Sequence, residues 1–406
     1  LQCGEMQSVM AKTSHKYGLF LLAIFIFLIY ILREDFLDTK EERKSVKLKL
    51  INFANDAKMA RTSSHNIGKT KSKDDTIVLV FWTTFFGAKP RLNGGNPRKW
   101  PFFHVGKKCP VKCELTAQQH RISEASGIVF HARDLSLDDL PPRKFRKLPW
   151  ILQTHENPVY TPVLRDPESM SKFNYFISYR LDADFPSPEF LKPRLDKPMP
   201  FEEKTKLVLA VYSNCEGLRT HYMDELSKFI QIDFYGSCLR THKFTSRTSD
   251  ENDTKLIELL RGYKFTLVFP NADCDYYVTE KMYNALSSGT VPVWLGTNKI
   301  DEVLKWGNLK HSVVKVKNFE SPKALADHLH FLAENKKEYN KYLRWKYEGF
   351  QFPPEYYESP IGVWWEGLPV YCRVCMRVAK DPKGHNGLPT ESCGDSRSER
   401  LAKLIP

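Results

Sequence analysis

The sequence predicts a two-lobed α/β protein in which each lobe is built on a parallel sheet. The first lobe is indicated by continuous apolar runs of strand length, such as residues 77–82 (IVLVFW), which are typical of buried parallel strands. The second lobe is indicated by strands and helices that alternate over residues 206–334. A proline-rich stretch at residues 185–200 separates the two. Sheets of this kind bind ligands at the carboxyl ends of their strands, so we expect a site in the cleft between the lobes.

The same patterns assign individual elements along the chain. In the first lobe, apolar runs predict strands at residues 77–82, 126–131, 148–153 and 173–179. In the second lobe, the predicted strands are residues 206–213, 231–236, 264–269 and 291–296, and the predicted helices are residues 222–230, 254–261, 279–288 and 322–334. The last helix is the most strongly marked, because Leu325, Leu329 and Leu332 recur on one face.

Composition places the chain among ordinary folded proteins. Of its 406 residues, 42% are hydrophobic and 27% are charged, which excludes a wholly disordered, collagen-like or multi-span membrane chain. Lysine and arginine exceed aspartate and glutamate by 61 − 48 = 13. This surplus favours an anionic partner, which is a nucleic acid, a membrane surface or a phosphate-bearing ligand, without choosing among them.

The N-terminal part predicts a membrane anchor. Residues 17–32 are apolar and uncharged, and Lys12 and Lys16 precede them, so the positive-inside rule makes residues 1–16 a cytosolic tail. The alternative is a cleaved signal peptide, but no small-x-small site follows Leu32. Residues 33–75 are charged and predict a stem. The rest of the chain is then lumenal, where disulfides form.

The densest polar cluster is FPNADCDYYVTEK at residues 269–281, which follows a predicted strand and leads into a predicted helix. Thr279 is the expected N-cap of that helix, so Glu280 and Lys281 fall in its first turn, where backbone amides bind anions. Lys281 is therefore a candidate for binding phosphate, and Glu280 for accepting hydrogen bonds from ribose hydroxyls. The alternative is that Glu280 only stabilises the helix dipole and that Lys281 is solvated.

This cluster resembles the signature of the α1,3-fucosyltransferases, glycosyltransferase family 10. In that signature Phe-Glu-Asn is followed, after a short gap, by Asp-Tyr-x-Thr-Glu-Lys. The matching residues here are Phe269, Asn271, Tyr277, Thr279, Glu280 and Lys281. Pro270 and Tyr276 depart from the usual Glu and Asp. Segments 81–87, 130–135, 174–184, 213–226, 232–238 and 321–346 also resemble the family, so the similarity runs from about residue 77 to 376.

The resemblance implies a GT-B fold of two Rossmann-like lobes with a cleft between them, preceded by the transmembrane helix and stem. It implies an acceptor-binding lobe at residues 76–200, a GDP-fucose-binding lobe at 201–350 and a cysteine-containing C-terminal tail at 351–406. The implied reaction moves L-fucose from GDP-β-L-fucose, with inversion, to a hydroxyl of a glycoprotein glycan, α1,3 to GlcNAc. Together with the anchor, it implies a single-pass type II protein of the Golgi membrane.

The resemblance also implies roles for individual residues. Glu156 is the candidate base that accepts the proton of the acceptor hydroxyl, with His155 and Asp134 as alternatives. Arg219 and Lys281 neutralise the departing diphosphate. The donor is held by Asn271, Tyr277, Thr279 and Glu280 as well. On the acceptor side the resemblance implies His131 and Arg133 beside Glu156, and Arg133 favours α1,3 transfer.

Two Asp-x-Asp pairs resemble metal ligands, Asp182 with Asp184 and Asp273 with Asp275. GT-B enzymes hold phosphates with basic side chains and a helix N-terminus, so the resemblance makes both pairs structural. We expect no obligatory metal and, at most, stimulation by Mn²⁺ or Mg²⁺.

Cys372 and Cys375 have a spacing that also occurs in zinc sites, but there is no second such pair, and a lumenal chain favours a disulfide. They resemble the Cys-x-x-Cys segment near the family's C-terminus. We expect Cys372 or Cys375 to pair with Cys393, and Cys109 and Cys113 to form bonds within the first lobe, although sequence does not fix the pairing.

Two other functions within the same fold stay open. One is a protein O-fucosyltransferase, and the other is a non-catalytic, lectin-like lumenal protein, for which Pro270 and Tyr276 are the only support. A nucleic-acid binder is disfavoured by the anchor and by the lack of a recognition motif.

Overall fold

The structure is a computed structural model that describes residues 76–90, 109–243 and 254–393, all of which belong to one compact unit of the chain. The predicted tail, anchor and stem, at residues 1–16, 17–32 and 33–75, lie outside the described residues. Within the described residues, no helix is both long enough and apolar enough to cross a bilayer.

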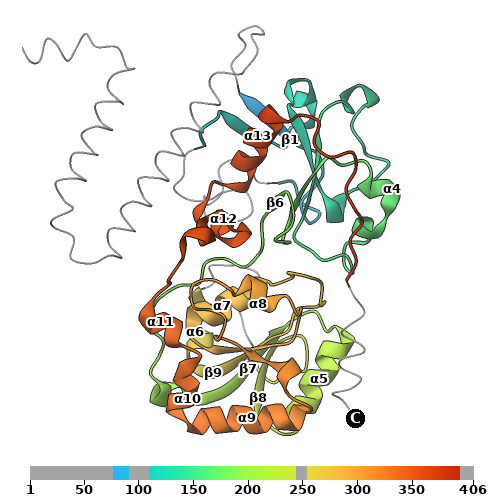
Figure 1. The fold of residues 1–406 in the computed structure, drawn as a ribbon. Helices are drawn as coiled ribbons and strands as arrows, with labels where there is room; N and C mark the ends of the chain where they lie inside the picture. The colour runs from blue at the N-terminus through green and yellow to red at the C-terminus, as the bar shows by residue number, and fades with distance from the viewer. Residues whose placement is uncertain (1–75, 91–108, 244–253, 394–406) are drawn as a thin grey trace, which may run out of the picture. The chain divides into compact units, whose positions relative to one another are not determined.

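The described residues form two sheets in which every pair of neighbouring strands is parallel, which confirms the predicted α/β class (Figure 1). The first sheet has the order β2 (Cys113–Thr116), β1 (Ile77–Phe81), β3 (Gly127–His131), β4 (Trp150–Thr154), β5 (Tyr175–Ser178), β6 (Phe185–Pro186). The second has the order β11 (Val314–Lys315), β10 (Val291–Trp294), β9 (Tyr263–Val268), β7 (Lys206–Tyr212), β8 (Ile232–Gly236).

The described helices are mostly in the second half of the chain. They are α4 (Pro167–Met170), α5 (Gly217–Ser227), α6 (Thr254–Arg261), α7 (Glu280–Ser288), α8 (Ile300–Val303), α9 (Pro322–Glu334), α10 (Lys336–Lys341), α11 (Arg344–Glu348), α12 (Pro360–Glu366) and α13 (Val370–Lys380). Short 3-10 helices span Gln119–Glu124, Ala132–Asp134, Arg143–Phe145, Pro162–Arg165, Phe201–Glu203, Val316–Asn318 and Pro354–Glu358.

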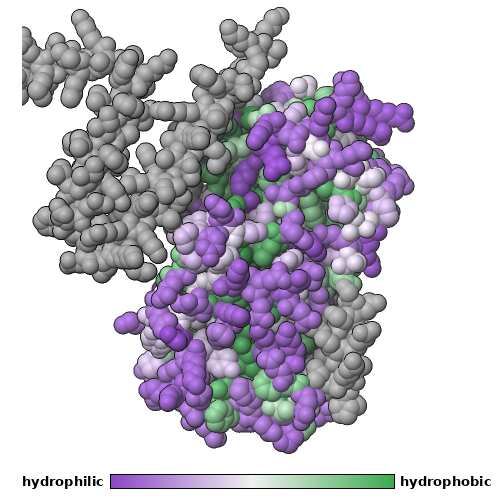
Figure 2. Space-filling model, in the orientation of Figure 1, coloured by the Kyte–Doolittle hydropathy of each residue, from purple (hydrophilic) through white to green (hydrophobic). Residues whose placement is uncertain are grey.

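The second sheet is covered on both faces, because alternate residues of its strands point to opposite sides. Val208 and Ala210 of β7 pack in the cluster that contains α5, α9 and α10, whereas Leu209 packs with α6. Val268 of β9 packs with α7. The apolar sides of these helices therefore face the sheet. On the face drawn in Figure 2 the described surface is largely hydrophilic, with hydrophobic atoms in narrow strips.

The first sheet is covered on one face by the last helices of the chain. Leu79 of β1 and Ile151 of β4 share a buried cluster with residues of α12 and α13, and Figure 1 shows α13 beside β1. The opposite face, which includes Phe130 and Leu152, packs against Leu388 and the segment around α4. Residues 360–393 therefore complete the core of the first sheet, although they follow the second sheet in the sequence.

The disulfides differ from the predicted pairing. Both cysteines of α13 bond to the part of the chain at β2, Cys372 to Cys109 before the strand and Cys375 to Cys113, its first residue. Cys393 pairs neither with Cys372 nor with Cys375 but with Cys274. The physical reason is the return of α13 to the first sheet, where Cys372 and Cys375, one helical turn apart, meet a neighbouring strand. A fourth bond, Cys215–Cys238, joins the loops after β7 and β8.

Most predicted elements are confirmed, and the differences have local causes. The helix expected at residues 222–230 is α5, which starts earlier because the Glu216 carboxylate caps the amides of Leu218 and Arg219. The edge strands β2, β6 and β11 were not predicted. They have two to four residues each, too few for a periodic signal.

Candidate functional site

The predicted site residues follow the carboxyl ends of parallel strands. His131 ends β3, Glu156 comes two residues after β4, and the 269–281 motif follows β9. Arg219 lies in the first turn of α5, after β7. Since loops at these ends diverge from hydrogen-bonded strands, side chains that are distant in sequence can meet there.

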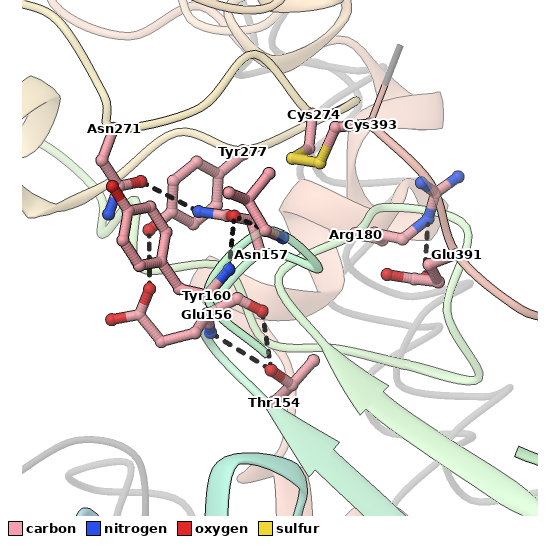
Figure 3. The surroundings of a disulfide bond; sticks show 11 residues. Thr154, Glu156, Asn157, Tyr160, Arg180, Asn271, Cys274, Tyr277, Glu391 and Cys393 are labelled. Atoms are coloured by element: carbon pink, nitrogen blue, oxygen red, sulfur yellow. Dashed lines mark hydrogen bonds and ion pairs between the residues drawn. A yellow bond between two sulfur atoms is a disulfide. The ribbon is translucent and has the colours of Figure 1, made fainter. Parts of the chain in front are cut away.

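Two hydrogen bonds join the loop after β4 to the motif after β9 (Figure 3). The Tyr277 hydroxyl donates to Glu156 Oε2 over 3.2 Å. Asn157 Nδ2 donates to Asn271 Oδ1 over 2.9 Å. The Asn157 side-chain oxygen also accepts from the backbone amides of Val159 and Tyr160, which fixes the loop itself. The structure therefore brings the candidate base together with two of the predicted donor-binding residues.

The surroundings of Glu156 make it a stronger base than an exposed carboxylate. Its side chain is 23% exposed, and burial raises its pKa, while the hydroxyl of Tyr277 and the guanidinium of Arg133 oppose the rise. Arg133 Nη1 lies 3.9 Å from Glu156 Oε1. Tyr277 stays protonated because burial, together with Glu156, raises its pKa well above its ordinary value. Tyr277 is thus a stable donor to Glu156.

His131 and Asp134 hold the turn after β1 rather than offering a base. The Asp134 carboxylate accepts from the Thr84 hydroxyl and from the amides of Phe86 and Gly87, and it pairs with His131 Nδ1. Although burial opposes it, these contacts lower the pKa of Asp134. Burial lowers the pKa of His131. A carboxylate that is stabilised by so many donors is a weak proton acceptor.

His155, the other alternative base, is fully buried. Its Nε2 lies 3.3 Å from the Ser187 hydroxyl, and burial, followed by the neighbouring His131, lowers its pKa well below the ordinary value. The imidazole is therefore neutral and is enclosed by the first half of the chain. Of the three candidates, Glu156 alone combines partial exposure with contacts to the motif.

The predicted helix after the motif is confirmed as α7, with Glu280 and Lys281 in its first turn. Thr279 is the N-cap by its backbone conformation, but its side chain makes no capping bond to α7. Lys281 Nζ lies 2.6 Å from Glu280 Oε1. Burial disfavours both charges, yet their attraction holds the pKa of Glu280 below, and that of Lys281 above, its ordinary value. The Lys281–Glu280 ion pair therefore lies at the N-terminus of α7, and the backbone amides of a helix N-terminus also stabilise a bound anion.

Arg219 is 3% exposed, and its guanidinium bonds the backbone. Nη1 donates to the carbonyl of Phe269 over 2.9 Å, and Nη2 donates to the carbonyl of Asn214. The group also lies 4.6 Å from the centre of the Tyr212 ring. Arg219 thus joins the ends of β7 and β9, a structural role that the sequence did not suggest.

The carboxylates of Asp182 and Asp184 have protein partners. Arg180 donates to both oxygens of Asp182, over 2.8 and 2.7 Å. Asp184 accepts from the amide of Phe176 and pairs with His385 Nε2. Within the described ranges, no group of three or more histidine, cysteine or carboxylate side chains is arranged to hold a metal ion.

Several residues of this neighbourhood were given no role at the site from the sequence. Asn157, Arg180 and Glu391 lie near the motif, and Cys393 is bonded to it (Figure 3). The ring of Tyr179 packs against that of Tyr277. Glu391 and Cys393 lie beyond α13 and reach the motif only because that helix returns to the first sheet. The available signal was the family-like segment 174–184, which contains Tyr179 and Arg180.

Comparison with known proteins gives consistent matches. The family model described as "Glycosyltransferase family 10 (fucosyltransferase) C-term" matches residues 201–389, and "Fucosyltransferase, N-terminal" matches residues 73–189. A solved structure of an α1,3-fucosyltransferase with GDP-fucose aligns with a TM-score of 0.47 at 18% identity, over 82% of this chain and 98% of that one.

Three curated proteins illustrate the sequence similarity. The mouse 4-galactosyl-N-acetylglucosaminide 3-alpha-L-fucosyltransferase 9 is 34% identical over 72% of this chain and 77% of its own length. The Drosophila melanogaster Alpha-(1,3)-fucosyltransferase B is 29% identical over 60% of this chain, which spans 59% of that protein. The bovine GDP-fucose protein O-fucosyltransferase 3 is 28% identical over 70% of this chain and 60% of its own length. With both family models matched in order, this chain belongs to glycosyltransferase family 10, the fucosyltransferases.

Proposed function

We propose that this protein transfers L-fucose from GDP-β-L-fucose to an acceptor hydroxyl with inversion at the anomeric carbon. The observation that carries the proposal is the placement of Glu156, a carboxylate of raised pKa, against Tyr277 of the 269–281 motif. Inversion needs a base on one face of the sugar and a stabilised leaving group on the other. Glu156 supplies the base, and the motif supplies the residues that hold the donor.

In the proposed mechanism, Glu156 accepts the proton of the acceptor hydroxyl as its oxygen attacks the anomeric carbon. The bond from that carbon to the β-phosphate oxygen of GDP breaks, and negative charge grows on the diphosphate. Lys281 and the backbone amides that begin α7 stabilise this charge. Asn271, Tyr277, Thr279 and Glu280 hold donor oxygens. Arg219 adds positive charge behind the loop, while its backbone bonds keep that loop in place.

For the acceptor we propose a GlcNAc unit of a glycoprotein glycan, in α1,3 linkage. The support is Arg133, half-exposed and 3.9 Å from Glu156, with His131 behind it, and the resemblance in which an arginine at this position accompanies α1,3 transfer. The name of the mouse relative describes 3-α-L-fucosyl transfer to a 4-galactosyl-N-acetylglucosaminide, and the name of the Drosophila relative describes α-(1,3)-fucosyl transfer. A second candidate acceptor is a protein hydroxyl, which the name of the bovine relative favours.

We further propose that the two sheets are the lobes of a GT-B enzyme, which residues 17–32 anchor in the Golgi membrane with the catalytic part in the lumen. The support for the location is the uncharged run with lysines before it, and the eight cysteines that form disulfides, a state that an oxidising lumen maintains.

A transfer assay with radiolabelled GDP-fucose tests the proposal and separates the acceptors. Glycans that carry a terminal N-acetyllactosamine, N-glycan cores and folded protein domains are offered in parallel, and the linkage of each product is determined. The proposal predicts label on the GlcNAc-bearing glycans. Label on protein hydroxyls alone would establish the second candidate, and saturable GDP-fucose binding without transfer to any acceptor or to water would indicate a lectin-like protein.

A further inference from the structure

The segment after α13 runs back along the first half of the chain as a strap, residues 381–393. Its backbone amides at His385, Leu388 and Glu391 donate to the carbonyls of Asn174, Met170 and Leu164, respectively. Leu388 is buried in the core of the first sheet. Three bonds of this kind and one buried side chain fix the path of the strap.

The strap ends in a disulfide within the site motif. Cys393 bonds to Cys274, which lies between Asn271 and Tyr277, the two residues that contact the loop of Glu156 (Figure 3). The sulfur pair shares a buried cluster with Tyr179, Ala272 and Tyr277. Among the described residues, the disulfide of the strap therefore falls inside the motif.

The backbone of this loop needs such a restraint. Tyr276 has a φ of 63°, in the left-handed region that a bulky side chain disfavours and that the family's usual Asp tolerates better. A strained residue keeps its conformation only when its surroundings fix it. The disulfide lies two residues before Tyr276, and the Tyr277 amide donates to the Cys274 carbonyl over 3.0 Å.

A second contact joins the strap to the same loop through Arg180. Arg180 Nε lies 3.4 Å from Glu391 Oε1 of the strap, and its guanidinium lies 5.7 Å from the centre of the Tyr276 ring. The Tyr276 hydroxyl donates to Glu302 on the other side. The strap is therefore linked to the loop directly at Cys274 and, through Arg180, at Tyr276.

We propose that the strap, through the Cys274–Cys393 disulfide, is a positioning element that holds Tyr277 in hydrogen-bond contact with Glu156. The pH-profile test of this inference rests on the proposed function, whereas the hydrogen–deuterium exchange test does not. When the restraint is removed, the loop relaxes at Tyr276, and the Tyr277 hydroxyl leaves the carboxylate.

The kinetic signature of this loss is a change in the pH profile. Tyr277 donates to the ionised form of Glu156, so losing this bond raises the pKa of Glu156 and moves the acid limb of kcat to higher pH. The other charged groups around Glu156 are Arg133, Glu280 and Lys281. None of these is bonded to the strap, so their effects should not change with it.

A double-mutant cycle tests the proposal. The strap variant carries Cys274→Ser with Cys393→Ser, the second variant is Tyr277→Phe, and the third combines all three changes. We expect the strap variant to move the acid limb in the direction that Tyr277→Phe does, and the combined variant to move it no further than Tyr277→Phe alone. Shifts that add in the combined variant, or no shift in the strap variant, would overturn the proposal.

The matched control is Cys109→Ser with Cys372→Ser, which removes another disulfide and leaves Cys113–Cys375 to hold α13. This control should lower the midpoint temperature of unfolding without moving the acid limb of the pH profile of kcat. An equal shift in the control would mean general loosening and would refute a specific role. If the strap variant does not fold, Leu388→Ala, which loosens the strap and keeps all four disulfides, takes its place in the cycle with the same expected outcomes.

Hydrogen–deuterium exchange without substrate separates this proposal from the transferase assignment. In the strap variant the amides of residues 271–277 should exchange at least about tenfold faster than in wild type, and in the control they should not. Unchanged exchange would reject the strap as a positioning element whether or not the protein transfers fucose. Faster exchange in a protein without transfer activity would sustain the strap and reject the proposed function.

Discussion

Lys281 stands at the start of α7 with Glu280 as its partner, and in the proposed mechanism it exchanges this contact for one to the diphosphate. Lys281 is one-third exposed, so it reaches both the carboxylate and the solvent side of the loop. A charge-assisted contact to a phosphate oxygen replaces the contact to Glu280 with little reorganisation. We therefore expect Lys281 to contribute to the affinity for GDP.

Lys281→Ala should weaken GDP binding by about 10- to 150-fold, because one charge-assisted contact contributes roughly 1.5–3 kcal/mol. Isothermal titration calorimetry measures the change. Lys323→Ala, which removes an exposed lysine of α9 paired with Asp327, is the control and should bind GDP as wild type does. Unchanged affinity in Lys281→Ala would remove this residue from the donor site.

Arg219 shows what the family resemblance implies and what it leaves out. The resemblance implied that Arg219 neutralises the diphosphate, and the sequence could not show that the carbonyls of Asn214 and Phe269 accept from its guanidinium. Those bonds depend on how β7 and β9 pair, and Phe269 is 50 residues from Arg219. The motif itself was predictable because strand, loop and helix are contiguous there.

Among the elements, the strap carries a buried carboxyl group, that of Glu391, whose pKa is raised. Glu391 is 9% exposed, and its Oε2 has no hydrogen-bond partner among the described residues. Burial raises its pKa to about 7, although Arg180 opposes the rise. The folded protein therefore holds a proton on Glu391 over a range in which the unfolded chain has lost it. Stability from this group is present at low pH and is lost as pH rises through about 7.

Glu391→Gln should remove this dependence. Between about pH 5 and about pH 8, the free energy of unfolding of wild type should fall relative to the variant by up to about 3 kcal/mol. Urea unfolding at the two pH values measures it. A wild-type protein that gains stability over the variant as pH rises would show that the pair with Arg180 ionises Glu391 at neutral pH.

The elements that the sequence predicted are those with internal signals. The apolar runs of β1, β3 and β9 and the leucine face of α9 identify them without tertiary information. The return of α13 to the first sheet had no such signal, because its cysteines fit several partners equally well. Once that return is known, chain connectivity places the start of the strap beside the first sheet, whereas the Cys274–Cys393 bond depends on the backbone contacts of the strap.

For the whole molecule, the proposed mechanism requires that protein groups alone supply the positive field at the donor diphosphate. In that mechanism Lys281 and the start of α7 supply it, and the chain as a whole is basic. Asp182 and Asp184 are already engaged with Arg180 and His385. Excess EDTA should therefore leave most of the fucosyl transfer intact, as followed by GDP release. Complete loss that Mn²⁺ or Mg²⁺ restores would assign a metal to one of the Asp-x-Asp pairs.

In the proposed mechanism Glu156 is the base of the fucosyl transfer, and the variant Glu156→Gln removes that base. The amide has the size of the carboxyl group but cannot accept the proton, so kcat should fall about 100-fold or more while GDP affinity is kept. Glu168→Gln, at an exposed carboxylate on α4, is the control and should turn over normally. If Glu156→Gln turns over at the wild-type rate at saturating GDP-fucose and acceptor, Glu156 is not the base.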